Sequence, residues 1–384
     1  MKFFAGLIFF LFVFKANAID LTITLTAIPA NTPEGHFIYI SGNFNNWATE
    51  RFSNILHVQL NGTRQIVLKD VSGIIEFKFN RGTWETAEGT AKGEFLPNRT
   101  YNTANGSKLN LTIEGWEDLS ASKVSTANAN VQILSNDFNL PQLNRNRKIW
   151  LYLPNDYVTA TNKNYPVIYM HDGQNLFDQN TSFSGEWKVD ETLAALQSQG
   201  KQGVIIVGIE NGGSERLNEY SPWVNSKYGG GQGDEYIEFI KNTLKPYIDS
   251  NFRTKKDAEN TGLFGSSMGA LISIYGAAKY PETFGKVGVF SPSVWFAKTE
   301  VLNFIKSKNF KKTPLRLYFL AGTNESPTMV KDMKSVRKVF LSKGVSVKEG
   351  KMLTHSDGAH SEWFWAREFR AAFTFLFPDS TLNK

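Results

Sequence analysis

The stretch TGLFGSSMGA, residues 261–270, decides how this chain folds, because it contains the pentapeptide Gly-Ser-Ser-Met-Gly at 265–269. A G-x-S-x-G sequence can form a nucleophile elbow, in which a serine stands on a sharp, strained turn between a strand and a helix. Leu263 and Phe264 supply the apolar end of a strand, and the small and apolar residues 270–278 have helical spacing. The stretch therefore predicts that Ser267 is a nucleophile at the start of a helix.

Length and composition indicate a globular protein with room for two domains. The chain has 384 residues, of which 41% are hydrophobic and 20% are charged. Its formal charge is +6, and the 42 basic residues form no prominent run, so we expect no nucleic-acid partner. The absence of cysteine excludes disulfides, thiol catalysis and thiolate metal sites. We expect no metal and no cofactor.

Residues 1–18 have the pattern of a secretory signal peptide. Lys2 is the positive start, residues 3–14 form an apolar core, and Ala16-Asn17-Ala18 is an A-x-A cleavage site. The alternative is a membrane anchor, but the apolar core is too short to span a bilayer as a mature helix. We expect a secreted or periplasmic protein with no stable membrane anchor.

Residues 19–118 have the alternating pattern of a β domain. Strands are expected at Asp20–Ala27, Gly35–Gly42, Arg64–Lys69, Ile74–Phe79 and Lys108–Glu114. Short strands separated by Gly, Asn and Pro clusters are typical of an immunoglobulin-like β-sandwich. The polar residues 119–130 have little hydrophobic pattern and are expected to be a linker.

Two tryptophans of this β domain lie in turn-like sequence. Trp47 follows Gly-Asn-Phe-Asn-Asn, and Trp84 follows Asn-Arg-Gly-Thr. Aromatic rings in such surroundings are expected to be partly exposed, where sugar rings can stack on them. The alternatives are that both rings plug the ends of the sandwich, or that the module is only a spacer.

The stretches YISGNFNNW, IEFKFNRGTWE and LPNRTYNT occur in this order. Together they resemble the glucoamylase-type starch-binding module. The resemblance implies a carbohydrate-binding site at Trp47, Trp84 and Lys78, with Asn98 in a turn near that site.

From residue 131 to 379 continuous apolar runs alternate with helical patterns. Strands are expected at Lys148–Leu153, Tyr165–Met170, Gly203–Ile209, Lys286–Phe290 and Leu315–Ala321, and helices at Lys188–Gln197, Asp234–Ser250, Ala270–Tyr280, Met329–Lys343 and His360–Leu376. This alternation predicts a mostly parallel sheet with helices on both faces. In such folds ligands bind at the carboxyl ends of the strands.

A nucleophilic serine needs a base to take its proton. After a nucleophile elbow the acid and then the histidine follow in chain order, which leaves His355 and His360. His360 is favoured, because a Gly-Ala-His loop running into a helix would hold it over the strand ends. The acid is expected after the strand at 315–321, where Glu325 could accept the histidine Nδ1–H. Asp332 and Asp357 stay open as alternatives.

An oxyanion formed during ester cleavage needs two backbone N–H donors. Met268, directly after the nucleophile, is expected to provide one. Gln174 is expected to provide the other, because it lies in the loop after the strand at 165–170, where Gly173 allows a tight turn.

The second half of the chain resembles the esterase D group of the α/β-hydrolases. The matching stretches include YMHDGQNLFD, SGEWKVDE, GIENGGSERLNEYSP, GSSMGALIS, LYFLAGTNES and GAHSEWFWAREFRAAFTFLF. That group includes feruloyl and acetyl xylan esterases of carbohydrate esterase family one, and enterobactin-type siderophore esterases. The resemblance implies catalysis by Ser267, His360 and Glu325 with oxyanion donors Gln174 and Met268, and it places Trp187, Arg216 and Tyr220 in loops over the site. These last three residues either contact substrate or pack the loops.

The sequence thus predicts a serine carboxylic-ester hydrolase that acts on acetyl or feruloyl esters of a polysaccharide. One alternative is the hydrolysis of a siderophore or other small aromatic ester. Another is a glycan-binding protein with an inactive hydrolase domain, against which the intact serine, histidine and oxyanion motifs argue.

Overall fold

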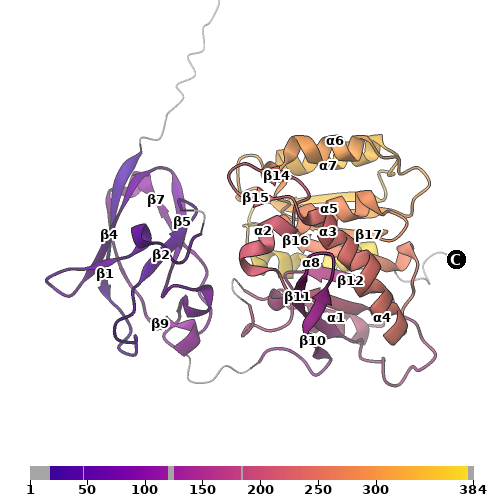
Figure 1. The fold of residues 1–384 in the computed structure, drawn as a ribbon, viewed down its shortest axis with the longest axis horizontal. Helices are drawn as coiled ribbons and strands as arrows, with labels where there is room; N and C mark the ends of the chain where they lie inside the picture. Colours follow the sequence, from indigo (N-terminus) through magenta and orange to yellow (C-terminus); the bar gives the residue numbers. More distant parts are fainter. Residues whose placement is uncertain (1–17, 46, 120–124, 183–184, 379–384) are drawn as a thin grey trace, which may run out of the picture. The chain divides into compact units, whose positions relative to one another are not determined.

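A computed structural model describes residues 18–45, 47–119, 125–182 and 185–378 (Figure 1). The chain divides into two compact units, residues 1–123 and 124–384, and each is described by itself. The predicted signal peptide covers residues 1–18 and, apart from Ala18, lies outside the described residues. Within the described ranges, no helix combines the length and apolar character needed to cross a membrane.

The first unit is all-β. One sheet has the strand order β3-β4-β1-β8 and a second has the order β2-β5-β7, with a small β6-β9 pair beside them. The strands are β1 Ile19–Ala27, β2 Tyr39–Gly42, β3 His57–Val58, β4 Arg64–Val71, β5 Ile74–Asn80, β6 Glu88–Gly89, β7 Arg99–Asn102, β8 Lys108–Thr112 and β9 Gly115–Trp116. The strand predicted from Gly35 begins only at Tyr39, and Gly35 lies in a preceding turn with a φ of 79°.

Alternation along the strands builds one core for the two larger sheets. Leu21, Ile23 and Leu25 of β1 are almost fully buried, and so are Phe77 and Phe79 of β5. All five belong to a single hydrophobic cluster. The first unit is therefore a β domain with a shared core, and its immunoglobulin-like classification stays a prediction.

The second unit is built on an eight-stranded sheet with the order β10-β11-β13-β12-β16-β17-β18-β19. The strands are β10 Val131–Leu140, β11 Arg145–Tyr152, β12 Val167–His171, β13 Ile205–Ile209, β16 Thr261–Ser266, β17 Lys286–Phe290, β18 Arg316–Gly322 and β19 Gly350–His355. The pairings of β10 with β11 and of β11 with β13 are antiparallel, and the remaining pairings are parallel. The predicted mostly parallel sheet is thus present.

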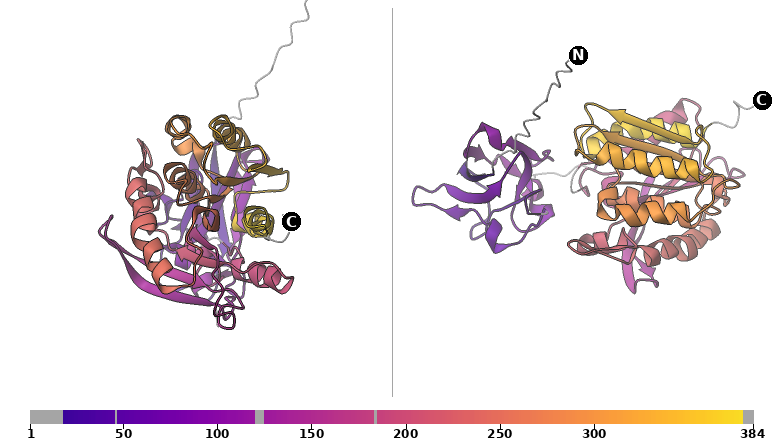
Figure 2. Two further views of the ribbon diagram at one scale, coloured as in Figure 1. Left: turned by 90° about the vertical axis from the view of Figure 1, so that its right-hand side faces the viewer. Right: turned by 90° about the horizontal axis from the view of Figure 1, so that it is seen from above.

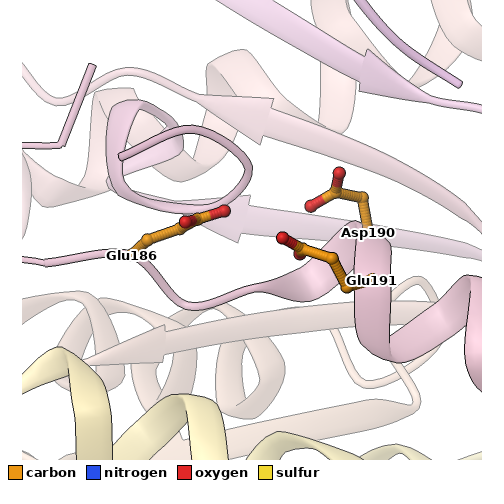
Figure 3. Close-up of side chains that lie close together, drawn as sticks. All are labelled: Glu186, Asp190 and Glu191. Atoms are coloured by element: carbon orange, nitrogen blue, oxygen red, sulfur yellow. The ribbon is translucent and has the colours of Figure 1, made fainter. Parts of the chain in front are cut away.

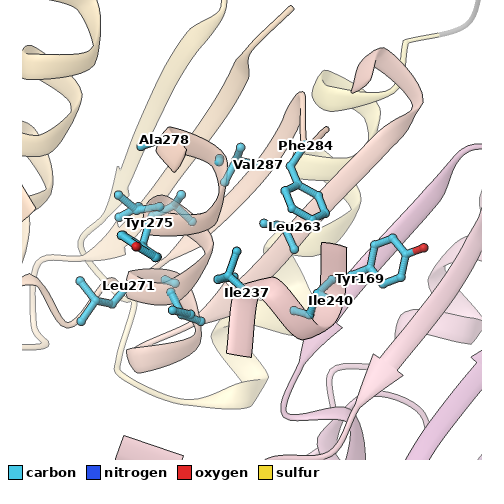
Figure 4. Packing of buried hydrophobic residues seen from close by; sticks show 14 of the residues in the cluster. Tyr169, Ile237, Ile240, Leu263, Leu271, Tyr275, Ala278, Phe284 and Val287 are labelled. Carbon is cyan, nitrogen blue, oxygen red and sulfur yellow. The ribbon is translucent and has the colours of Figure 1, made fainter. Parts of the chain in front are cut away.

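Helices cover both faces of this sheet (Figure 2). They are α1 Val189–Ser198, α2 Arg216–Glu219, α3 Gly233–Phe239, α4 Lys245–Asn251, α5 Met268–Lys279, α6 Lys298–Lys306, α7 Met329–Ser342 and α8 Glu362–Leu376, and a π-helical turn, Ile240–Leu244, joins α3 to α4. Along β12, Val167 and Tyr169 face a core formed with α3, α5 and α7 (Figure 4), whereas Ile168 and Met170 face one formed with α1 and α8. Period-two alternation in a sheet buried on both sides explains the continuous apolar runs.

The carboxyl ends of four neighbouring parallel strands position the residues of interest. Ser267 follows β16, Ser291 follows β17, Glu325 follows β18, and His360 lies in the loop between β19 and α8. Since parallel strands end at the same edge of a sheet, side chains far apart in sequence meet there.

Candidate active site

Ser267 stands on a strained turn between β16 and α5. Its φ of 57° and ψ of −120° lie in a region that residues with a side chain rarely adopt. The turn is held because the Ser267 N–H donates to the Phe290 carbonyl oxygen at 2.9 Å. A Cβ at Gly265 would lie 2.6 Å from the carbonyl carbon of Gly269, and one at Gly269 would lie 3.2 Å from the His171 Cβ. The close approach of these segments explains the two glycines of the motif.

Ser267, His360 and Glu325 form a continuous chain of hydrogen bonds. The Ser267 Oγ lies 3.0 Å from the Nε2 of His360, and the His360 Nδ1 lies 2.8 Å from Glu325 Oε2. With Nδ1 carrying the proton, Nε2 is free to accept the proton of Ser267. The arrangement has the geometry required to activate a serine as a nucleophile.

The Glu325 carboxylate is held at both oxygens. Oε2 faces His360, whereas Oε1 accepts from the Ser291 Oγ at 2.7 Å and from the Gly322 N–H at 2.5 Å. The indole Nε1–H of Trp365 in turn donates to the Ser291 Oγ at 2.9 Å. The Glu325 side chain is 1% exposed, so these donors supply the compensation that a buried carboxylate needs.

The alternative acids and the alternative base have other partners. Asp332 is buried on α7 and pairs with Lys298, while Asp357 is exposed and pairs with Arg367. His355 lies 3.3 Å from Glu368. Among the candidates left open by the sequence, only His360 and Glu325 are joined to Ser267.

Ser293 contacts the nucleophile and was missed by the sequence analysis. Its Oγ lies 3.0 Å from the Oγ of Ser267, and its N–H donates to the Ser267 carbonyl oxygen at 3.0 Å. It follows β17 by three residues, so a search for polar side chains after each predicted strand would have found it.

Both predicted oxyanion donors lie next to strand ends. Met268 is the first residue of α5, where N–H groups have no intrahelical partner. Gln174 lies in the 3-10 turn Gly173–Asn175 after β12. In the described part of the chain neither N–H donates to a protein acceptor. Gly173 is needed for close packing, since a Cβ there would lie 2.7 Å from the carbonyl carbon of Gly208.

A buried polar cluster supports the loop that carries Gln174. Arg216 pairs with Asp172 through two hydrogen bonds of 2.6 and 2.9 Å, and the Asp172 N–H donates to the Tyr220 hydroxyl at 3.1 Å. Burial opposes ionisation of Asp172, but the Arg216 guanidinium outweighs it and lowers the pKa of the carboxyl. Burial also lowers the pKa of the neighbouring His171 to about 4, so this ring is neutral.

Two predicted substrate contacts need correction. Tyr220 is fully buried beneath Asp172, and Trp187 is 3% exposed and packs against Phe290 and Trp365. Their rings are buried in the packing of the loops, which is the second of the two expectations. Arg216 keeps part of its side chain exposed, although Asp172 holds its guanidinium.

In the β domain the structure brings Trp47 and Trp84 together but removes Lys78 from the surface. The two indole rings have centroids 6.0 Å apart with an interplanar angle of 46°, and both side chains are partly exposed. The Lys78 side chain is 1% exposed, and its Nζ lies 2.7 Å from Glu117. An ammonium held by a buried ion pair is not available to a sugar, so Lys78 is corrected to a structural residue. Asn98 is exposed in the loop before β7.

Comparisons with known proteins agree with this arrangement. The family model described as "Putative esterase" matches residues 141–376. The "Uncharacterized protein YbbA" of Bacillus subtilis (strain 168) is 29% identical over 245 residues, which cover 60% of this chain and 93% of YbbA.

Two further curated relatives match parts of the chain. The "Siderophore triacetylfusarinine C esterase" of Aspergillus fumigatus is 26% identical over 148 residues, 37% of this chain and 49% of that protein. The "Endo-1,4-beta-xylanase/feruloyl esterase" of Xylanibacter ruminicola is 29% identical over 144 residues, 37% of this chain and 19% of that protein.

Among solved structures, the enterobactin esterase FES from Shigella flexneri superposes with a TM-score of 0.52 at 15% identity, covering 88% of this chain and 87% of that one. At that identity the match concerns the fold alone. Together with the family model it confirms the predicted α/β-hydrolase fold of the second unit.

Proposed function

Because this chain belongs to the esterase family whose model matches residues 141–376, it is a carboxylic ester hydrolase, and we propose that it works through a triad of Ser267, His360 and Glu325. The observation that carries the proposal is the hydrogen-bonded chain of 3.0 and 2.8 Å that joins the three side chains. An inactive hydrolase domain is disfavoured, because such a domain has no need of this alignment.

In the proposed reaction the Ser267 Oγ attacks the carbonyl carbon of the ester while His360 Nε2 takes the hydroxyl proton. Glu325 stabilises the imidazolium that forms, and the N–H groups of Met268 and Gln174 donate to the oxyanion. Collapse of this intermediate releases the alcohol, which receives its proton from His360. Water then attacks the acyl-enzyme by the same route and releases the carboxylic acid.

The decisive variant is Ser267→Ala. We expect it to reduce hydrolysis of a chromogenic acetate ester by about 10⁶-fold in kcat, the size of effect measured in a serine protease when the nucleophile is removed. Ser342→Ala, which removes an exposed hydroxyl from α7, is the matched control and should keep full activity. Turnover that survives Ser267→Ala in a folded protein would rule out the mechanism.

For the substrate we propose acetyl or feruloyl esters of a polysaccharide. The partly exposed Trp47–Trp84 pair supports this choice, since adjacent indole faces suit the apolar faces of sugar rings. A module that grips the polymer would raise the local concentration of its esters. The feruloyl esterase named among the relatives supports the same substrate class.

A siderophore ester is the second candidate, and the relative named as a siderophore esterase favours it. The two candidates differ in what the esterified alcohol is attached to. Initial rates on feruloylated xylooligosaccharide, acetyl xylan and a ferric siderophore ester, measured side by side, separate them. A kcat/KM highest for the siderophore ester would overturn the polysaccharide assignment.

We propose further that the protein is secreted or periplasmic, on the basis of the signal-peptide pattern in residues 1–18. The intact mass of the protein exported by an expression host tests this. A mature chain beginning at Ile19 would support the proposal, and a chain that retains residues 1–18 would contradict it.

A further inference from the structure

Three carboxylates gather at the start of α1, outside the hydrogen-bonded chain of Ser267. Glu186 lies in the segment before the helix, and Asp190 and Glu191 lie in its first turn. Their carboxyl groups point toward one another (Figure 3), and each presents one oxygen within 4.8 Å of the other two.

One oxygen of each carboxylate has no partner among the described residues. Glu186 is 7% exposed and Asp190 is fully buried. Within the described ranges, Glu186 Oε1, Asp190 Oδ1 and Glu191 Oε2 are buried without a hydrogen-bond partner, and no basic side chain forms an ion pair with any of the three. Buried carboxylates are normally paired, protonated or bound to a metal ion.

The remaining oxygens of the two most buried members are already fixed by the chain. Thr126 Oγ1 donates to Glu186 Oε2 at 3.0 Å, and the Asn128 N–H donates to Asp190 Oδ2 at 2.8 Å. Each of these carboxylates is therefore oriented by one oxygen and leaves the other free toward the centre of the group. Outer hydrogen bonds of this kind orient metal ligands in proteins.

The three carboxylates are close enough to repel one another when they are ionised. Their oxygens lie within 4.8 Å of one another, and Glu186 and Asp190 are buried, where water screens charge poorly. Such a group is stabilised either by a shared proton or by a cation among its members.

We propose that Glu186, Asp190 and Glu191 bind a divalent cation and that Ca²⁺ is the ion that fits. The available ligands are oxygens alone, which favours a hard cation over zinc. Ca²⁺ binds oxygens at about 2.3–2.6 Å, so two of its ligands lie at most about 4.6–5.2 Å apart, and three oxygens that all lie within 4.8 Å of one another satisfy this limit. Mg²⁺ demands near-ideal octahedral geometry at about 2.0–2.1 Å and gives up its waters reluctantly, so three carboxylates held by the fold suit it less.

The bound ion would stabilise the folded protein. Since Glu186 and Asp190 also hold Thr126 and Asn128, a cation between the carboxylates ties residues 126–128 to the start of α1. Ligands that bind only the folded state raise its stability by mass action. The ion takes no part in the proposed ester chemistry.

Thermal unfolding of the full chain tests the proposal. After treatment with EDTA, CaCl₂ should raise Tm in a saturable manner, with half-saturation on the order of 10⁻⁴–10⁻³ M, the range of extracellular calcium modules. MgCl₂ should have a weaker effect. Glu191→Gln, at the least buried ligand, should weaken the apparent affinity by about tenfold or more. Glu235→Gln removes an exposed acidic residue from the first turn of α3 and should leave the response unchanged.

Calorimetric titration with CaCl₂ provides a readout that does not depend on unfolding. We expect one site per chain in the wild type and in Glu235→Gln, and its loss in Asp190→Asn. Binding that persists in Asp190→Asn would place the ion elsewhere and overturn the proposal. If CaCl₂ leaves Tm unchanged but a lower pH raises it, a shared proton occupies the group. That result would also overturn the proposal.

Discussion

Glu325 is the most buried member of the chain that begins at Ser267, and its surroundings explain how a glutamate serves there. The His360 side chain is 37% exposed, whereas that of Glu325 is 1% exposed. Because Ser291 and the Gly322 N–H hold Oε1, the other oxygen is directed at His360 Nδ1. The carboxylate thereby sets the tautomer in which Nε2 faces Ser267.

We expect Glu325→Gln to lower kcat by about 10⁴-fold while the protein stays folded, because the neutral amide no longer stabilises the imidazolium or fixes its tautomer. Steady-state kinetics with a chromogenic acetate ester measure the effect. Asp357→Asn removes an exposed carboxylate that pairs with Arg367, and this control should leave kcat unchanged. A larger loss of kcat in Asp357→Asn than in Glu325→Gln would show that the acid is assigned wrongly.

His171 makes stability depend on pH. Its Nδ1 lies 2.9 Å from the Tyr236 hydroxyl, and its buried Nε2 has no partner among the described residues. Burial lowers its pKa to about 4 in the folded state, below the value of 6.5 for the unfolded chain. Between these values the unfolded chain binds a proton that the folded protein does not, so the free energy of unfolding falls as the pH falls.

Through His171 the free energy of unfolding should fall by about 3 kcal/mol between about pH 6.5 and about pH 4. Denaturant unfolding at a series of pH values should therefore show stability declining through that window in the wild type. In His171→Gln the free energy of unfolding should fall by about 3 kcal/mol less over the same pH window. Equal slopes for both proteins would contradict the buried neutral state of His171.

At the level of elements, β16 and α5 form the unit that presents the nucleophile. The helix is buried on nearly all sides, which agrees with its apolar sequence. The turn between the two elements passes so close to His171 that a Cβ at Gly265 would lie 2.9 Å from the His171 ring. The two glycines therefore allow the close approach of the turn to the neighbouring segments.

Gly265→Ala should destabilise the fold by about 1–3 kcal/mol, the usual cost of forcing extra volume into a packed core. It should also lower kcat about 100-fold, because a shift of about 1 Å misplaces the Ser267 Oγ. Thermal unfolding and ester kinetics measure both effects. Gly350→Ala is a suitable control, since its nearest neighbour is the flexible end of Leu341 at 3.1 Å. A Gly265→Ala protein with the stability and kcat of the wild type would show that the turn has room for a Cβ at this position.

Two of the strands that the sequence did not predict lie at the borders of the large sheet. β10 and β19 are its two outer strands, and both have partly exposed residues along their length. An outer strand is buried on fewer sides, so its sequence lacks the continuous apolar run by which the central strands were recognised. α6 was also missed. The helices covering the centre of the sheet were predicted to within a few residues.

At the level of the whole molecule, two separate compact units divide the proposed functions. The hydrogen-bonded chain of Ser267 lies within the second unit, and the Trp47–Trp84 pair lies within the first. Polymer retention and ester cleavage should therefore respond to different substitutions.

The double variant Trp47→Ala plus Trp84→Ala should lose retention on starch or xylan while kcat and KM for a small chromogenic ester stay unchanged. The physical reason is the loss of two stacking faces, each worth roughly 2–3 kcal/mol when about 100 Å² of ring is covered. Affinity electrophoresis and ester kinetics measure the two properties. Phe52→Ala removes a highly exposed ring from the same unit and is the matched control, which should keep retention. Retention that survives the double variant would exclude the tryptophan pair as the sugar site.

By itself the sequence determined that strands and helices alternate in the second unit. It also singled out Ser267, His360 and Glu325, because an elbow motif is local and the order of its partners along the chain is constrained. Only the tertiary structure decided that Lys78, Trp187 and Tyr220 are buried. It also decided that Ser293 meets the nucleophile and that Glu186 meets Asp190 and Glu191. Burial and juxtaposition depend on segments distant in sequence that pack against one another, and no local pattern records those contacts.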